Sequence, residues 1–95
     1  MRLEFSRWIE SDIEGIVDFA AEYSPGRAVR LARLIREKLR RIAKQPFLYQ
    51  VRHELGEELR LATVDRYVIL FSVEQDVVRI ERIIYGGRDL LALLQ

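Results

Sequence analysis

The segment YVILFSV at residues 67–73 decides the fold, because it is apolar on both faces of an extended strand. Its alternating side chains fall into two sets, with Tyr67, Ile69, Phe71 and Val73 on one face and Val68 and Leu70 on the other. A strand of this kind lies in the middle of a sheet, where each of its faces is covered by another layer. We therefore predict a central strand at residues 67–73.

Two more strands are predicted beside this one. Residues 59–64 precede it across the turn Asp65-Arg66, and residues 77–85 follow it across the turn at residues 74–76. Both connections have hairpin length, so consecutive strands should run in opposite directions. The second half of the chain should thus form an antiparallel meander of three strands.

The first half of the chain shows a short strand followed by two helices. Leu3 and Phe5 alternate with polar residues, which indicates an N-terminal strand with one buried face. Ser11 has the spacing of an N-cap, with Glu14 three residues later as in a capping box. The apolar face of this helix comprises Ile9, Ile13, Ile16, Val17 and Ala20.

A second helix should begin at Ser24-Pro25, a capping residue followed by a proline that suits the first turn. Pro46 should end it at Gln45. Two amphipathic helices with so short a link form an antiparallel hairpin, which can cover one face of the sheet. Residues 10–22 are acidic and residues 27–44 are basic, so the two helices should attract each other, though each exposed pair contributes little.

The remaining segments should complete the sheet's cover. Residues 46–58 are predicted to form a loop that lays its aromatic side chains over the edge of the core. Gly86-Gly87 breaks the chain, and residues 88–94 should form a short C-terminal helix or extension. This segment or a partner would cover part of the sheet's second face. The whole of residues 1–95 is thus predicted to be one α+β domain, with the helix hairpin packed on a mostly antiparallel sheet.

The composition limits the chemistry. The chain has no cysteine and one histidine, His53, so disulfides, thiolate catalysis and cysteine-bound zinc are excluded. His53 lacks a second ligand at metal-binding spacing, and we expect neither a metal nor a cofactor. No apolar stretch is long enough for a membrane span, and the N-terminus lacks the apolar core of a signal peptide. The absence of cysteine suits a reducing compartment, and we expect a cytoplasmic protein.

The order of these elements and several short motifs resemble the ParE/RelE toxin superfamily over essentially the whole chain. The motifs are LR at residues 59–60, YVILF at 67–71 and IERIIYGGRD at 80–89, preceded by DIEGI at 12–16 and QP at 45–46. The resemblance implies a RelE/ParE-like fold. It also implies the toxin of a type II toxin–antitoxin pair, which a small antitoxin holds inactive.

The superfamily has two branches with different activities. The RelE branch cleaves ribosome-bound mRNA and carries an arginine on the central strand, where this chain has Val68, and a C-terminal tyrosine, where it has Leu94. The ParE branch inhibits DNA gyrase by binding. We therefore predict a ParE-like gyrase inhibitor that is not an enzyme. A RelE-type ribonuclease and an inactive relative that serves as an interaction module remain alternatives.

The resemblance also implies the partners and the surface that binds them. The expected partners are a ParD-like antitoxin of the ribbon-helix-helix type and DNA gyrase. Direct DNA binding is not expected without the antitoxin, which normally performs that task. The candidate residues for target or antitoxin binding are Arg60, Arg82, Tyr85, Arg88, Asp89, Leu90, Leu91 and Leu94.

Two of these residues allow more than one interpretation. Arg82 lies mid-strand between Ile80 and Ile84 on the same face, so it should either pair with an acid or lie exposed on a functional surface. Asp89 is the candidate acid for such a pair. Tyr85 could donate a proton, or it could be an amphipathic ring at the end of a strand.

Overall fold

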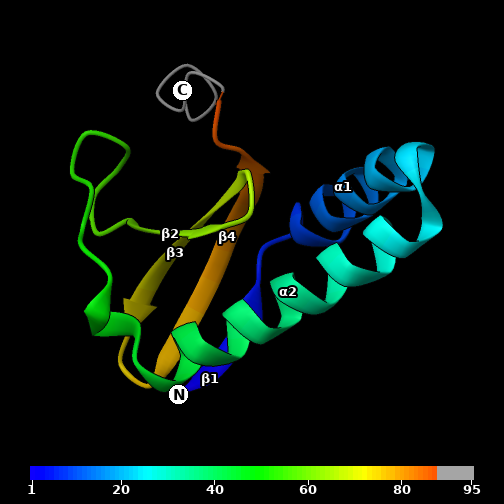
Figure 1. Ribbon diagram of the computed structural model, residues 1–95. Coiled ribbons are helices and arrows are strands. Elements are labelled where there is room, and N and C mark those ends of the chain that lie inside the picture. Colours follow the sequence, from blue (N-terminus) through cyan, green and yellow to red (C-terminus); the bar gives the residue numbers. More distant parts are fainter. Residues whose placement is uncertain (88–95) are drawn as a thin grey trace.

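Two helices lie against one face of a four-stranded sheet in the computed structural model, which describes residues 1–87 (Figure 1). The elements are β1 (Arg2–Phe5), α1 (Ile9–Tyr23), α2 (Pro25–Lys44), the 3₁₀ turn η1 (Pro46–Leu48), β2 (Arg60–Val64), β3 (Tyr67–Glu74) and β4 (Val77–Tyr85). The predicted α+β architecture is confirmed. The C-terminal helix predicted at residues 88–94 lies outside the described residues.

The strands are ordered β1-β4-β3-β2, so β3 and β4 are central. The pairs β2–β3 and β3–β4 are antiparallel, as predicted for the meander. β1 pairs with β4 in parallel, from Arg2 opposite Val77 to Phe5 opposite Ile80. This direction follows because the chain leaves β1, passes through the helix hairpin and returns to the sheet by a long crossover.

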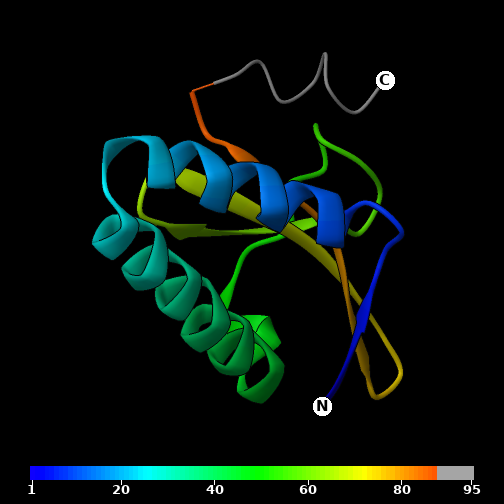
Figure 2. The same cartoon turned by 90° about the vertical axis from the view of Figure 1, so that its right-hand side faces the viewer.

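The main core lies between the helices and the sheet (Figure 2). Ile35 and Ile42 of α2 meet Ile69, Phe71 and Ile80 of the central strands there, and none of these side chains is more than 2% exposed. The apolar face predicted for α1 lies in the same core, with three of its five residues buried and two partly buried, and is therefore confirmed.

The edge position of β1 limits what that strand can bury. Leu3 packs partly against the core, whereas Phe5 is 51% exposed. The expectation of one buried face on this strand is thus only half right.

A second, smaller core covers the other face of β3. Val68 and Leu70 pack there with Ile84 of β4 and with Leu55 from the loop before β2. The prediction that both faces of β3 are covered is confirmed within the described residues, and the loop provides part of the cover.

The aromatic residues of that loop differ from the expectation. Tyr49 packs edge-on against Phe71, with ring centroids 5.7 Å apart. Phe47 and Leu48 of η1 are 62% and 72% exposed. The 3₁₀ turn points these two side chains outward, so only Tyr49 covers the core edge as predicted.

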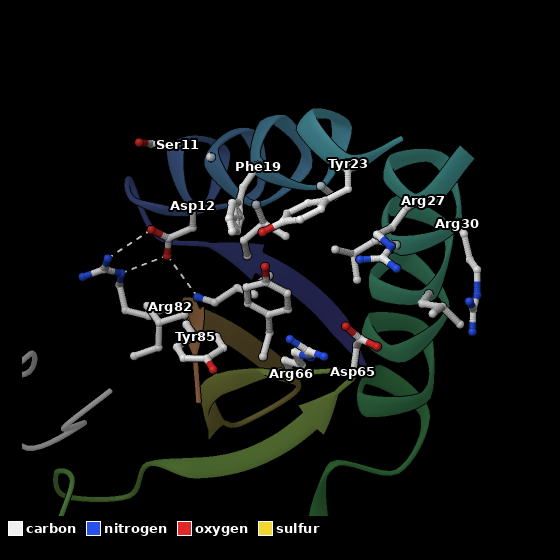
Figure 3. Close-up of a pocket in the computed structure, with 18 residues that line it drawn as sticks. Ser11, Asp12, Phe19, Tyr23, Arg27, Arg30, Asp65, Arg66, Arg82 and Tyr85 are labelled. Carbon is white, nitrogen blue, oxygen red and sulfur yellow. Dashed lines mark hydrogen bonds and ion pairs between the residues drawn. The ribbon is translucent and has the colours of Figure 1, made fainter. Parts of the chain in front are cut away.

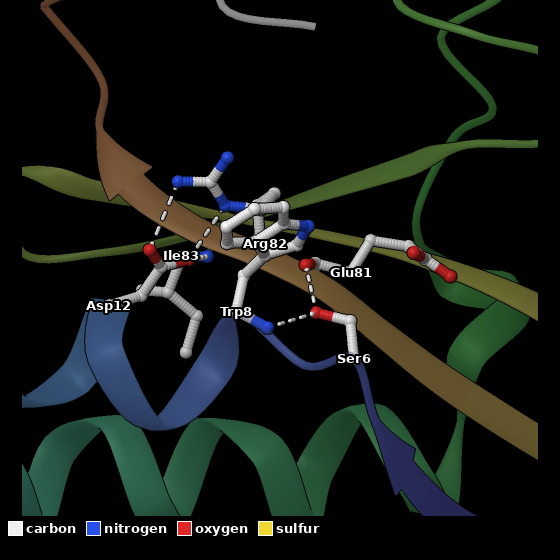
Figure 4. Close-up of polar contacts among 6 residues, drawn as sticks. All are labelled: Ser6, Trp8, Asp12, Glu81, Arg82 and Ile83. Atoms are coloured by element: carbon white, nitrogen blue, oxygen red, sulfur yellow. Dashed lines mark hydrogen bonds and ion pairs between the residues drawn. The ribbon is translucent and has the colours of Figure 1, made fainter.

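α1 begins earlier than its apparent capping box. Its first residue is Ile9, and Ser11 is an exposed residue inside the helix, so the predicted N-cap is wrong. Ser6 fixes the start instead (Figure 4): its hydroxyl donates to the carbonyl oxygen of Glu81 at 2.6 Å and accepts the N–H of Trp8 at 3.2 Å. A contact with β4 therefore determines where the first turn of α1 begins. The sequence pattern of the helix gives no signal of this contact.

α2 follows its sequence signals at both ends. The Ser24 side chain accepts the N–H of Arg27 at 3.0 Å, and Pro25 occupies the first turn. The helix ends at Lys44, directly before Gln45, as Pro46 requires. No helix within residues 1–87 combines the length and the apolar composition that crossing a membrane requires.

Ser6→Ala should lower the free energy of unfolding by about 1–3 kcal/mol, because it leaves the carbonyl of Glu81 without its buried donor. Urea denaturation of both proteins measures the difference. Ser11→Ala is the matched control and should change stability by less than about 0.5 kcal/mol. A larger loss in Ser11→Ala than in Ser6→Ala would instead support the capping box at Ser11.

Candidate functional site

An open groove of 1010 Å³ lies between the helix hairpin and the end of the sheet (Figure 3). Four parts of the chain line it: one side of α1, the first half of α2, the β2–β3 turn and the last residues of β4. These segments are far apart in sequence. The groove exists because α1 crosses above the end of β4, while the short β2–β3 turn closes the opposite side.

Aromatic rings form the floor and one wall of the groove. Phe19 and Tyr23 of α1 pack edge to face, with centroids 5.4 Å apart, and Tyr67 and Tyr85 do so at 6.1 Å. Phe19, Tyr23 and Tyr85 are 47%, 66% and 46% exposed. Exposed rings of this kind are the usual anchors of protein–protein interfaces.

Cationic side chains surround these rings. Arg27 and Arg30 of α2 and Arg66 of the turn line the groove, and Arg27 lies 5.5 Å from the centre of the Tyr23 ring. Among the ion pairs within residues 1–87, none includes any of these three arginines. The groove therefore suits a partner segment that combines acidic and apolar side chains.

The hydroxyl of Tyr67 remains protonated at neutral pH. Its burial raises the pKa above the usual 10.0, and the nearby carboxylate of Asp65 and the Tyr85 hydroxyl raise it further, whereas Arg66 lowers it. A phenol with a raised pKa is a poor general base near pH 7. In the groove Tyr67 can serve as a hydrogen-bonding aromatic surface.

Arg82 is held by Asp12 of α1 (Figures 3 and 4). The carboxylate accepts two hydrogen bonds from the guanidinium, at 2.9 and 3.0 Å, and a third from the backbone N–H of Ile83 at 3.0 Å. The hydrogen bond with Asp12 raises the pKa of Arg82, against the opposing effect of burial. Within residues 1–87, the partner of Arg82 is thus Asp12, and the candidate Asp89 lies outside the described residues.

A bulge in β4 accounts for the direction of Arg82. Leu70 is opposite Arg82 and Phe71 is opposite Ile80, so Glu81 is an extra residue in β4. The bulge shifts the alternation, and Ile80 and Ile83 both enter the main core. The expectation that Ile80, Arg82 and Ile84 share one face is therefore wrong.

The structure separates the predicted site residues. Arg82 and Tyr85 both line the groove. Arg60 lies elsewhere, where it donates to the carbonyl oxygen of Tyr49 and lies 5.0 Å from the Phe47 ring. It thus ties the η1 loop to β2. Arg88, Asp89, Leu90, Leu91 and Leu94 lie outside the described residues.

Sequence reasoning missed several residues of the groove. Phe19 and Tyr23 are four residues apart on α1 and off its buried stripe, which is a detectable signal of an exposed aromatic pair. Asp12 and Arg66 gave no such signal, because only the packing of α1 over the sheet brings them to the site. Within residues 1–87, no group of three or more His, Cys, Asp or Glu side chains is placed to hold a metal ion.

Asp12→Ala should destabilise the fold by about 2 kcal/mol, because it leaves a partly buried guanidinium and a backbone N–H without their acceptor. Asp18→Ala, which removes an exposed carboxylate from the same helix, is the control and should have little effect. Urea denaturation of these proteins, of Arg82→Ala and of the double variant Asp12→Ala/Arg82→Ala gives the coupling energy. Additive losses in the double variant would contradict a direct Asp12–Arg82 interaction.

Comparison with known proteins bears out the resemblance. A solved structure described as "Chromosomal ParDE TA system from P. aeruginosa" superposes with a TM-score of 0.76 at 20% sequence identity, covering 90% of this chain and 95% of the other. A search of curated protein sequences finds no significant match. The sequence matches the family described as "ParE toxin of type II toxin-antitoxin system, parDE" over residues 3–90. With nearly its whole length matched, the chain belongs to the ParE toxin family of type II toxin–antitoxin systems.

Proposed function

We propose that this toxin inhibits DNA gyrase by binding to it, that it performs no chemistry of its own, and that a cognate antitoxin neutralises it. It would act in the cytoplasm, where its target is found. The alternative within the superfamily is cleavage of ribosome-bound mRNA. Cleavage would need cationic side chains on the face of the sheet that meets the phosphate, whereas inhibition by binding would not. The side chains on this sheet favour binding.

The environment of Val68 carries this proposal. In the nuclease branch, the corresponding position of the central strand holds an arginine that clamps phosphate. Here Val68 is 7% exposed and packs with Leu55, Leu70 and Ile84 in the second core. A surface covered by aliphatic side chains offers no cations to the developing charge of a cleaved phosphodiester.

The polar residues nearby support the same view. The guanidinium of Arg82 is already engaged by both oxygens of Asp12, which limits its use as a phosphate ligand. Tyr67 has a raised pKa, which disfavours it as a base. The Tyr85 ring packs edge-on against Tyr67, as expected for an aromatic contact surface.

We assign the groove to protein partners. Its exposed rings and its arginines Arg27, Arg30 and Arg66 complement an acidic segment with apolar side chains, such as an antitoxin tail. The antitoxin would be ParD-like, with a ribbon-helix-helix DNA-binding part. Arg82 and Tyr85 would belong to this binding surface. The C-terminal residues Arg88, Asp89, Leu90, Leu91 and Leu94 remain our candidates for partner binding.

The purified protein should inhibit DNA supercoiling by gyrase, and addition of the cognate antitoxin should restore it, because the antitoxin would occupy the surface that the toxin needs. Supercoiling is read on agarose gels, with ribosome-bound mRNA incubated in parallel. The mRNA should stay intact. Codon-positioned cleavage of that mRNA, with gyrase unaffected, would overturn the proposal in favour of the nuclease.

Two substitutions near the end of β4 separate binding from acid–base chemistry. Tyr85→Phe removes only a hydroxyl and should leave most of the toxicity, whereas a proton-transferring tyrosine would lose about 10²-fold or more in rate. Arg88→Glu should abolish toxicity through charge repulsion at the partner surface. Growth inhibition after induction is the measurement, and a thermal transition shows that each variant is folded. A folded but inert Tyr85→Phe beside a toxic Arg88→Glu would contradict the binding model.

A further inference from the structure

The outer side of α2 carries an unusual concentration of positive charge. The helix holds eight basic side chains and one acidic one, Glu37. Five of the basic side chains are exposed and lie outside the groove, on the side of the helix opposite its buried stripe. We call them the α2 basic face: Arg33, Arg36, Arg40, Arg41 and Lys44.

The neighbouring acidic helix does not pair with this face. α1 contributes five carboxylates and no basic residue. The four ion pairs found within residues 1–87 are Arg2–Glu4, Arg52–Glu54, Arg79–Glu81 and Arg82–Asp12. Any attraction between the two helices therefore acts without close ion pairs in this part of the chain. The net charge of +1 thus conceals a basic surface that no ion pair within residues 1–87 neutralises.

The α2 basic face lacks the features of a protein interface. The groove presents three exposed aromatic rings, whereas the only exposed large hydrophobic side chain of α2 is Val29, which lies outside the basic face. Protein interfaces depend on buried aromatic or aliphatic anchors, whereas contact with a phosphate backbone needs little besides cations. Charge without anchors favours a polyphosphate partner over an acidic protein.

The shape of the helix fits such a partner. α2 has 20 residues and is about 30 Å long, and it lies at the edge of the molecule with one long side turned away from the sheet (Figure 2). Its cations recur every three or four residues along that side. A straight row of this length can contact several successive phosphates of a duplex without entering a groove or reading bases.

We propose that the α2 basic face binds the phosphate backbone of double-stranded DNA without sequence preference. This inference goes beyond the proposed function, because the contact requires neither gyrase nor the antitoxin. It also departs from the expectation, drawn from the family resemblance, that the toxin does not bind DNA without the antitoxin. The carboxylates of α1 oppose it at long range, so isolated binding should be weak and strongly salt-dependent. Where a partner already holds DNA, the face would add phosphate contacts to the complex.

The test is fluorescence anisotropy of a labelled duplex oligonucleotide of random sequence at several low salt concentrations. The variant Arg33→Gln/Arg36→Gln/Arg40→Gln should lower the association constant about tenfold or more, and should reduce the slope of log K against log salt by roughly 2–3. Glutamine is a good helix former, so the helix should persist, and circular dichroism checks this. The same three positions changed to lysine should keep most of the affinity, because backbone contact depends on charge.

The matched control is Arg2→Gln/Arg52→Gln/Arg79→Gln, which removes the same charge from exposed arginines that already have carboxylate partners. It should change the association constant by less than about twofold. If both glutamine variants lost the same affinity for DNA, the loss would follow from net charge alone, and the proposal would be overturned. The absence of binding by the unmodified toxin, or tighter binding of polyglutamate than of DNA to the α2 basic face, would overturn it as well. Since gyrase is absent from the assay, failure of the gyrase proposal would leave this result unaffected.

Discussion

The incomplete edge of β4 is the constraint on which the rest of the structure depends. β1 pairs with only the first four residues of β4. On that edge, the second half of β4 faces α1 without a neighbouring strand, while β3 pairs with its other edge. Buried backbone groups must find other partners. The Ser6 hydroxyl donates to the carbonyl oxygen of Glu81, and the Asp12 carboxylate accepts the N–H of Ile83. These two side chains thus make hydrogen bonds that a neighbouring strand would otherwise make.

These hydrogen bonds hold α1 against β4, and the position of α1 in turn creates the groove. Asp12 anchors the first turns of the helix to β4, and the helix then carries Phe19 and Tyr23 over the end of the sheet. The bulge at Glu81 belongs to the same arrangement, because it directs Ile83 into the main core and leaves Arg82 to meet Asp12. An arginine that looked like a free site residue is therefore partly structural, and the groove around it supplies the exposed chemistry.

The groove and the α2 basic face suit different kinds of partner. The groove combines aromatic rings with arginines and suits an acidic polypeptide, while the α2 basic face has cations alone and suits phosphates. The face of the sheet that a nuclease would use is instead closed by aliphatic packing around Val68. A small domain of the ParE family can thus serve as a set of contact surfaces, with its sheet as the support.

The sequence by itself determined the order of the main helices and strands within residues 1–87, and the family. The apolar segment at residues 67–73, the hairpin turns and the Ser24-Pro25 signal are local patterns, and local patterns are set by side-chain periodicity and backbone preference. Only the tertiary structure decided the parallel pairing of β1, the start of α1 at Ile9, the Asp12–Arg82 pair and the residues of the groove. Each of these depends on contacts between segments far apart in the chain. A carboxylate 70 residues from its arginine leaves no trace in periodicity or spacing, because the packing of α1 across the sheet alone brings them together.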